Sequence, residues 1–209
     1  MRAFFRGIVC GALGLVGACT EPDAEHDVHS AVPAVPGDDA TLHAAALQSV
    51  SPEEVAAARA RWPADLLAIV KRAEREFDVP TVSVLAFDAL PEGTVLFDVR
   101  TSAEASVSSI PSAHLLADEH ARQALLDAPP SGPVVVSCAA GWRSARFTQA
   151  LRAKGVEAYN LEGGLFAWVA AGRTILDPDG RATKRVHTYN KDWASSLPTD
   201  HEVVLEPKP

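Results

Sequence analysis

A cysteine at the end of a β-branched run brings together the residue types that nucleophilic chemistry needs. We assign to this candidate site Cys138, Ala139, Ala140, Gly141, Trp142, Arg143 and Ser144. The run at 134–137 predicts a strand, and the spacing of apolar residues over 144–154 predicts a helix. Because a helix N-terminus has unpaired N–H donors and about half a positive charge, its position next to Cys138 favours the thiolate. The thiolate is the nucleophilic form of cysteine.

The residues that follow Cys138 also suit a bound anion. The small residues at 139–141 allow the backbone to curl, so that its N–H groups can form an anion-binding nest. The guanidinium of Arg143 can hold an oxyanion through two parallel hydrogen bonds. Ser144 is expected to cap the helix. Trp142 is expected either at the mouth of the site, where it would shape access, or packed against a neighbouring loop.

Strands and helices alternate from residue 80 onward. The expected strands are 81–85, 94–99, 114–116, 134–137 and 156–161, and the expected helices are 101–107, 118–127, 144–154 and one opened by Gly163-Gly164. This alternation predicts an α/β fold with a parallel sheet covered on both faces. Ligands of such folds bind at the carboxyl ends of the strands. Cys138 lies at one such end, and Asp98 lies near another.

Four motifs, in order, resemble the signatures of the rhodanese domain of sulfurtransferases. They are Leu96 to Arg100 with Glu104, Ser108 to Ala113, Cys138 to Ser144, and Asn160 to Trp168. The resemblance covers residues 80–176 and implies a rhodanese-like fold, with about five parallel strands and helices on both faces. The second motif departs from the family, because Ser109 and Ser112 stand where it usually has His and Gly.

The resemblance implies sulfur transfer. In the family, the cysteine takes the outer sulfur of a donor such as thiosulfate, holds it as a persulfide, and passes it to cyanide or a thiol. For this chain, the resemblance implies that Cys138 and Arg143 are catalytic. The binding residues for substrate or persulfide are Ala139, Ala140, Gly141, Trp142, Ser144 and Asp98. Asp98 is expected to orient groups of the loop, and Arg100 and Glu104 to pair with each other or with the domain frame. No cofactor and no metal are expected.

Other functions fit parts of this pattern. Phosphatases related to this family carry a longer Cys-x5-Arg loop, so the Cys-x4-Arg spacing of Cys138 and Arg143 favours sulfur over phosphate. A rhodanese frame without turnover, serving as an interaction module at the membrane, is an alternative. A thiol sensor is another, although it would need a resolving cysteine from a second protein. A complete loop favours the enzyme, because an inactive module need not keep a nucleophile.

The N-terminus has the pattern of an export signal. Arg2 and Arg6 precede a short apolar run, which is too short to span a bilayer and typical of a signal peptide over 1–18. Its end, Leu15 to Cys19, resembles the lipobox of bacterial lipoproteins, which implies a lipid on Cys19; an ordinary secretory signal is the alternative. Because Thr20 rather than aspartate follows, the outer membrane facing the periplasm is favoured over the inner membrane. Cys138 would then be the sole free thiol of the mature chain.

The remaining segments complete the expected organisation. We expect a flexible linker over residues 19–50 and a helical extension over 51–79. The rhodanese domain is expected over 80–176, with a tail over 177–209 that packs on it. The net charge of −8 argues against a nucleic-acid partner. The expected partners are a small-molecule sulfur donor and acceptor, and the membrane through the lipid on Cys19. We expect a monomer.

Overall fold

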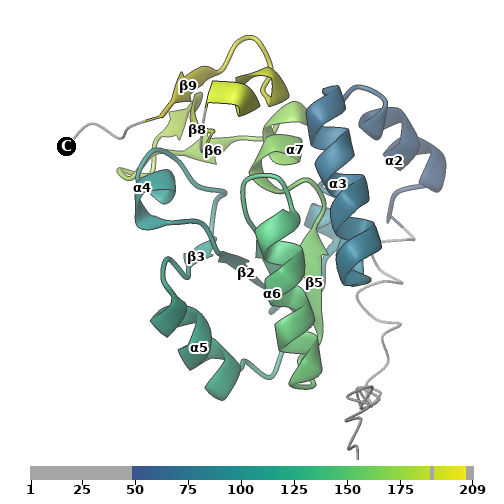
Figure 1. Cartoon of the computed structure of the whole chain (residues 1–209), viewed down its shortest axis with the longest axis vertical. Coiled ribbons are helices and arrows are strands. Elements are labelled where there is room, and N and C mark those ends of the chain that lie inside the picture. Colours follow the sequence, from purple (N-terminus) through teal and green to yellow (C-terminus); the bar gives the residue numbers. More distant parts are fainter. Residues whose placement is uncertain (1–48, 189–190, 206–209) are drawn as a thin grey trace, which may run out of the picture. The chain divides into compact units, whose positions relative to one another are not determined.

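Five short parallel strands form the central sheet, in the spatial order β1-β5-β4-β2-β3 (Figure 1). They are β1 (Thr81–Val82), β2 (Val95–Asp98), β3 (His114–Leu115), β4 (Val134–Ser137) and β5 (Ala158–Leu161). The middle strand β4 is buried along its whole length and pairs with β2 so that Asp98 lies opposite Ser137. The predicted parallel sheet is confirmed, and Cys138 follows directly at the carboxyl end of its central strand.

The structure is a computed structural model that describes residues 49–188 and 191–205, all within one unit, Val32–Pro209. The expected signal peptide, Cys19 and nearly all of the linker lie outside the described residues. Among the residues that are described, no helix has the length and apolar character needed to cross a membrane.

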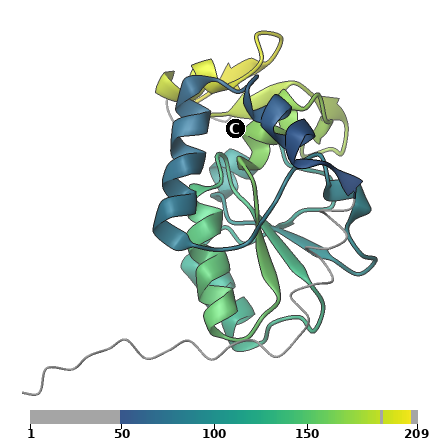
Figure 2. The same ribbon diagram turned by 90° about the vertical axis from the view of Figure 1, so that its right-hand side faces the viewer.

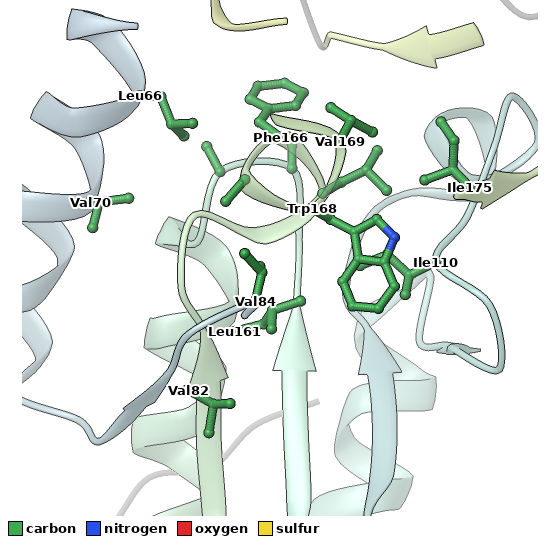
Figure 3. Packing of buried hydrophobic residues seen from close by; sticks show 14 of the residues in the cluster. Leu66, Val70, Val82, Val84, Ile110, Leu161, Phe166, Trp168, Val169 and Ile175 are labelled. Carbon is green, nitrogen blue, oxygen red and sulfur yellow. The ribbon is translucent and has the colours of Figure 1, made fainter. Parts of the chain in front are cut away.

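Helices cover both faces of the sheet, as the sequence predicts. On one face, α5 (Glu119–Asp127) and α6 (Trp142–Ala153) pack on Val134 and Val136. On the other face, α7 (Gly164–Ala170) and α3 (Ala64–Phe77) pack on a core that includes Val135 and Leu161. Figure 3 shows this second core, with the strands pointing toward α7. Because β-strand side chains alternate between faces, the β-branched run of β4 contributes to both cores.

The helical extension forms two helices, α2 (Pro52–Arg59) and α3, and Pro63 is the N-cap residue of α3. Ser51 begins α2 with a capping box completed by Glu54. Helix α3 lies beside α6 (Figures 1 and 2) and buries Leu66, Val70, Ala73 and Phe77. Arg59 bonds to Glu74 of α3 and to the buried Glu162 after β5, which fixes the extension to the domain.

Short elements complete the described chain. They are η1 (Phe87–Ala89), α4 (Ser102–Ala105), the antiparallel pair β6 (Ile175–Leu176) and β7 (Ala182–Thr183), the parallel pair β8 (Arg185–His187) and β9 (Glu202–Val204), and η2 (Lys191–Ser196). In the tail, Val186 and Leu197 are buried in the core on the α7 side of the sheet, and η2 contacts α3. The expected strand 81–85 is shorter than predicted, because only Thr81 and Val82 pair with β5.

Candidate active site

Cys138 lies at the bottom of a tight loop between β4 and α6 and is 2% exposed. The backbone N–H of Gly141 donates to its Sγ at 3.2 Å, and the hydroxyl of Ser144 donates to the same sulfur at 3.3 Å. Gly141 is the N-cap of α6, so Cys138 stands beside a helix N-terminus as predicted. Two hydrogen-bond donors and the N-terminal end of α6 thus face one sulfur.

The predicted start of this helix is wrong by two residues, and with it the role of Ser144 as a cap. Helix α6 begins at Trp142, and Gly141 caps it with a left-handed φ of 89°. This backbone conformation, which glycine adopts without steric cost, turns the chain so sharply that the helix starts at once. Ser144 is therefore inside the first turn, where its hydroxyl faces the sulfur of Cys138.

The start of α7 holds the loop from the other side. The N–H of Leu165 donates to the carbonyl oxygen of Cys138 at 2.9 Å, and the N–H of Phe166 donates to that of Ala139 at 2.9 Å. These bonds need a close approach of two backbones. Gly164 permits it, because a Cβ at this position would lie 2.2 Å from the carbonyl oxygen of Cys138. The Gly163-Gly164 pair thus positions the loop that carries Cys138.

Arg143 is fixed by a bidentate pair with Glu104. Its Nη1 and Nη2 donate to the two carboxylate oxygens at 2.8 and 2.6 Å, and Glu104 is only 1% exposed. Glu104 also accepts from the N–H and hydroxyl of Thr101, and so completes the capping box of α4. The terminal nitrogens that the sequence suggested for a bound oxyanion are engaged with this carboxylate. Arg143 therefore reaches the site with its charge already paired.

Arg100 and Glu104 do not pair with each other; each pairs with another group of the domain, which was the second expectation. Arg100 binds Asp98 at 2.6 Å, and both side chains are buried. In an extended chain, residues two positions apart share a side, so Asp98 and Arg100 meet directly, whereas the α4 turn carries Glu104 toward the loop. Besides the Asp98 pair, the Arg100 guanidinium donates to the carbonyl of Ser108. The charge of Asp98 affects the pKa of Arg143 only after larger effects, namely burial, which acts to lower it, and the hydrogen bonds of Glu104 and the charges of Cys138 and Glu104, which raise it.

A cavity of about 260 Å³ opens in front of Cys138. Its lining residues are Ile69, Cys138, Ala139, Ala140, Trp142, Arg143, Phe166, Thr188 and Trp193. The cavity thus brings together Cys138 and four of the predicted site residues after it, while Ser144 and Asp98 are buried beside it. Trp142 lines the cavity, as one of the two expectations had it, and it packs on helix α3 rather than on a loop. Its ring makes an edge contact with Phe77, and the guanidinium of Arg72 lies 4.2 Å from its centroid.

Four of the lining residues were not predicted as site residues from the sequence: Ile69, Phe166, Thr188 and Trp193. Phe166 lies in the fourth motif, where its neighbour Trp168 is a core residue, and nothing in the motif separates the two roles. Ile69, Thr188 and Trp193 come from the segments before and after the predicted domain. Only the folded chain shows that these segments reach the site.

The ion pair between Glu104 and Arg143 is expected to make the stability of the fold depend on pH. Burial acts to raise the pKa of Glu104, but the hydrogen bonds and charge of Arg143, together with Thr101, lower it from 4.5 to about 2. Because the pKa is lower in the folded state, the ionised carboxyl stabilises the fold at pH values above its pKa in the unfolded chain. This contribution is lost as the pH falls from that pKa through the pKa of the folded state. At about 1.4 kcal/mol per pKa unit, Glu104→Gln is expected to cost roughly 3–4 kcal/mol at pH 7.

Urea unfolding from pH 7 down to pH 3 measures this effect. The difference between wild type and Glu104→Gln should begin to shrink below about pH 4.5, because the variant lacks the carboxyl that titrates. Glu119→Gln is the matched control: its side chain is 82% exposed and pairs on the surface with Arg122, so its expected cost is under about 1 kcal/mol. Equal effects of the two replacements at pH 7 would contradict the assignment.

Comparison with known proteins agrees with these features. The model of the Rhodanese-like domain matches residues 86–171. A sulfurtransferase from Allochromatium vinosum is 33% identical over 90 residues, which cover 43% of this chain and 84% of that protein.

Two solved structures are also similar. A rhodanese-related protein from Thermoplasma volcanium is 22% identical, with a TM-score of 0.43, over 46% of this chain and 97% of that one. A thiosulfate sulfurtransferase from Pseudomonas aeruginosa is 26% identical, with a TM-score of 0.45, over 55% of this chain and 23% of that one. From the family model and the Allochromatium relative, together with the parallel sheet and the cysteine loop, this chain belongs to the rhodanese-like family of sulfurtransferases.

Proposed function

We propose that the protein is a sulfurtransferase that moves a sulfane sulfur from a donor such as thiosulfate to a thiophilic acceptor through a persulfide on Cys138. One observation carries the proposal: the sulfur of Cys138 receives hydrogen bonds from Gly141 and Ser144 at a helix N-terminus and lines an open cavity. A structural cysteine needs neither the donors nor the cavity. A nucleophilic thiolate needs both.

The reaction divides into two displacements at sulfur. In the first, the Cys138 thiolate attacks the outer sulfur of the donor, a new S–S bond forms, and the old S–S bond breaks. With thiosulfate, the electron pair of that bond leaves with sulfite. In the second, the acceptor attacks the terminal sulfur of the persulfide and the Cys138 thiolate is regenerated. The two steps balance without an external oxidant or reductant.

The loop supplies electrostatic support for both steps. The Gly141 N–H and the Ser144 hydroxyl stabilise negative charge on Sγ when it is the attacking group and again when it is the leaving group. Burial acts to lower the pKa of Arg143, but its hydrogen bonds with Glu104 and the charges of Cys138, Glu104 and Asp98 raise that pKa above its ordinary value. Arg143 therefore remains a cation beside the sulfur throughout turnover.

A turnover assay tests the proposal. Purified protein is incubated with cyanide and with thiosulfate or an organic thiosulfonate, and thiocyanate is measured against protein concentration. We expect many thiocyanate molecules per protein molecule with at least one donor. Thiocyanate that never exceeds one equivalent, or is not formed from any donor, would contradict catalysis.

We further propose that the protein is exported and anchored in a bacterial envelope through a lipid on Cys19, facing the periplasm. The support is the order of a charged start, a short apolar run and the Leu15 to Cys19 motif. A lipid adds about 0.8 kcal/mol of membrane affinity per buried CH₂. Cys19→Ser is expected to remove fatty-acid label and to shift the protein from the membrane to the soluble fraction of cells. Unchanged labelling in this variant would exclude Cys19 as the acceptor.

A further inference from the structure

The cavity in front of Cys138 has apolar walls from four separate elements. Ile69 comes from α3, Trp142 from α6, Phe166 from α7 and Trp193 from η2. Ile69 and Trp193 both lie outside residues 86–171, which match the family model. The catalytic loop is thus shared with the family, whereas two walls of its cavity belong to the segments that flank the matched domain in this chain.

These two walls are held in place. Trp193 packs against the core that lies between the sheet and α7, and its ring centroid is 6.3 Å from that of Phe166. Next to it in η2, the hydroxyl of Ser195 donates to Asp65 at the start of α3 at 3.2 Å. Ile69 lies one turn further along α3 and packs on the same core. The cavity is therefore walled by packed side chains, and its shape can select among ligands.

The charge of the cavity disfavours a small dianion. Among the described residues that line it, Arg143 is the one cationic side chain, and its Nη1 and Nη2 bind the carboxylate of Glu104. A multiply charged anion that left water for this cavity would lose hydration and meet a cation whose terminal nitrogens already bind a carboxylate. An apolar group would instead gain from leaving water.

The size of the cavity also exceeds the needs of an inorganic donor. An apolar cavity of about 150 Å³ is large enough to hold benzene. At about 260 Å³, this cavity has room for an aromatic or branched group in addition to the sulfur that reacts with Cys138.

We propose that this enzyme selects organic sulfane-sulfur donors with an apolar aromatic or branched group, and that Ile69 and Trp193 determine this specificity by contacting that group. The inference rests on the proposed function. With a thiosulfonate, R–SO₂–S⁻, the Cys138 thiolate bonds to the terminal sulfur, and the bond between that sulfur and the sulfonyl sulfur breaks. The electron pair leaves with the sulfinate R–SO₂⁻, and Cys138 keeps the persulfide.

Three donors with the same kind of terminal sulfur test the proposal: benzenethiosulfonate, methanethiosulfonate and thiosulfate, each with cyanide as acceptor. The measured quantity is kcat/KM, divided by the rate of each donor with free cysteine in solution, which removes differences in intrinsic reactivity. We expect benzenethiosulfonate to exceed both other donors by at least about tenfold, as burial of a phenyl group predicts.

Trp193→Ala and Ile69→Ala are expected to lower the ratio of kcat/KM for benzenethiosulfonate to kcat/KM for methanethiosulfonate by about fivefold or more. Each replacement removes apolar area from the cavity wall. Methanethiosulfonate carries only a methyl group in place of the phenyl ring and therefore serves as the reference donor within each variant. Leu115→Ala, at an exposed position of the edge strand β3, is the matched control and should keep the wild-type ratio. The two variants lie on different elements, so a folding defect in one leaves the other informative.

Distinct outcomes separate the two proposals. If thiosulfate reacts as well as benzenethiosulfonate, or if both wall variants keep the wild-type ratio, the specificity inference is overturned while sulfur transfer stands. If none of the three donors yields thiocyanate or a sulfur-bearing Cys138, the proposed function itself fails.

Discussion

Replacement of Cys138 by serine is expected to abolish sulfur transfer and to leave the fold intact. A serine hydroxyl is a far weaker nucleophile than a thiolate and forms no persulfide, so thiocyanate formation should fall by at least about a thousandfold. The Gly141 N–H and Ser144 hydroxyl that now contact Sγ would find an oxygen acceptor in its place. The free energy of unfolding should therefore change by less than about 1.5 kcal/mol.

Two measurements on the same preparation separate chemistry from folding. Thiocyanate formation is measured with the best donor, and unfolding is followed in urea. Leu115→Ala, at the exposed edge of the sheet, serves as the control and should keep the activity of the wild type. A Cys138→Ser protein that is folded and retains a tenth of the wild-type rate would show that the sulfur is carried elsewhere.

The largest effect on stability is expected for Gly164→Ala. Gly164 has a φ of 53°, and a Cβ there would lie 2.2 Å from the carbonyl oxygen and 3.0 Å from the carbonyl carbon of Cys138. Both contacts are with backbone, so either α7 or the Cys138 loop must move. The N–H bonds from Leu165 and Phe166 to the loop would be stretched or lost. We expect a loss of about 3 kcal/mol or more in urea unfolding, together with a fall in activity.

Gly155→Ala is the matched control for this prediction. Gly155 also has a positive φ, of 81°, but a Cβ there meets nothing within 4 Å. Its cost should be that of the left-handed backbone alone, about 1–2 kcal/mol. The difference between the two variants measures the close approach of α7 to the loop. Equal costs would mean that this approach does not constrain the loop.

The sequence predicted the sheet and the tight loop after Cys138 well, because both depend on local patterns. The β-branched run of β4 is buried on both faces of a parallel sheet, and such a run identifies a central strand. The small residues after Cys138 require a tight loop. Helix α6 begins earlier than predicted because Trp142 and Arg143, in its first turn, contact Phe77 and Glu104 and show no helical spacing of apolar side chains.

The ion pairs were predicted less well, although one signal was present. Thr101 and Glu104 have the spacing of a capping box, which turns the glutamate back toward the start of its own helix and away from Arg100. That spacing could have excluded the pairing of Arg100 with Glu104. The partner of Glu104 could not be inferred, since Arg143 lies 39 residues away and reaches it only in the folded chain.

The walls of the cavity could not be predicted at all. Ile69 belongs to an amphipathic helix whose spacing indicates only that one face is buried. Trp193 lies in a tail without helical or strand periodicity. Their meeting over Cys138 depends on how two flanking segments pack against α7, and no local pattern contains that information.

A persulfide on Cys138 is tested most directly by the intact mass of the purified protein. After incubation with a sulfane-sulfur donor and removal of the excess, we predict a gain equal to the mass of one sulfur atom, located on the peptide that contains Cys138. Cyanide should then remove this sulfur and release one equivalent of thiocyanate. Wild-type protein that shows no such gain with thiosulfate or with either thiosulfonate would contradict the proposed function.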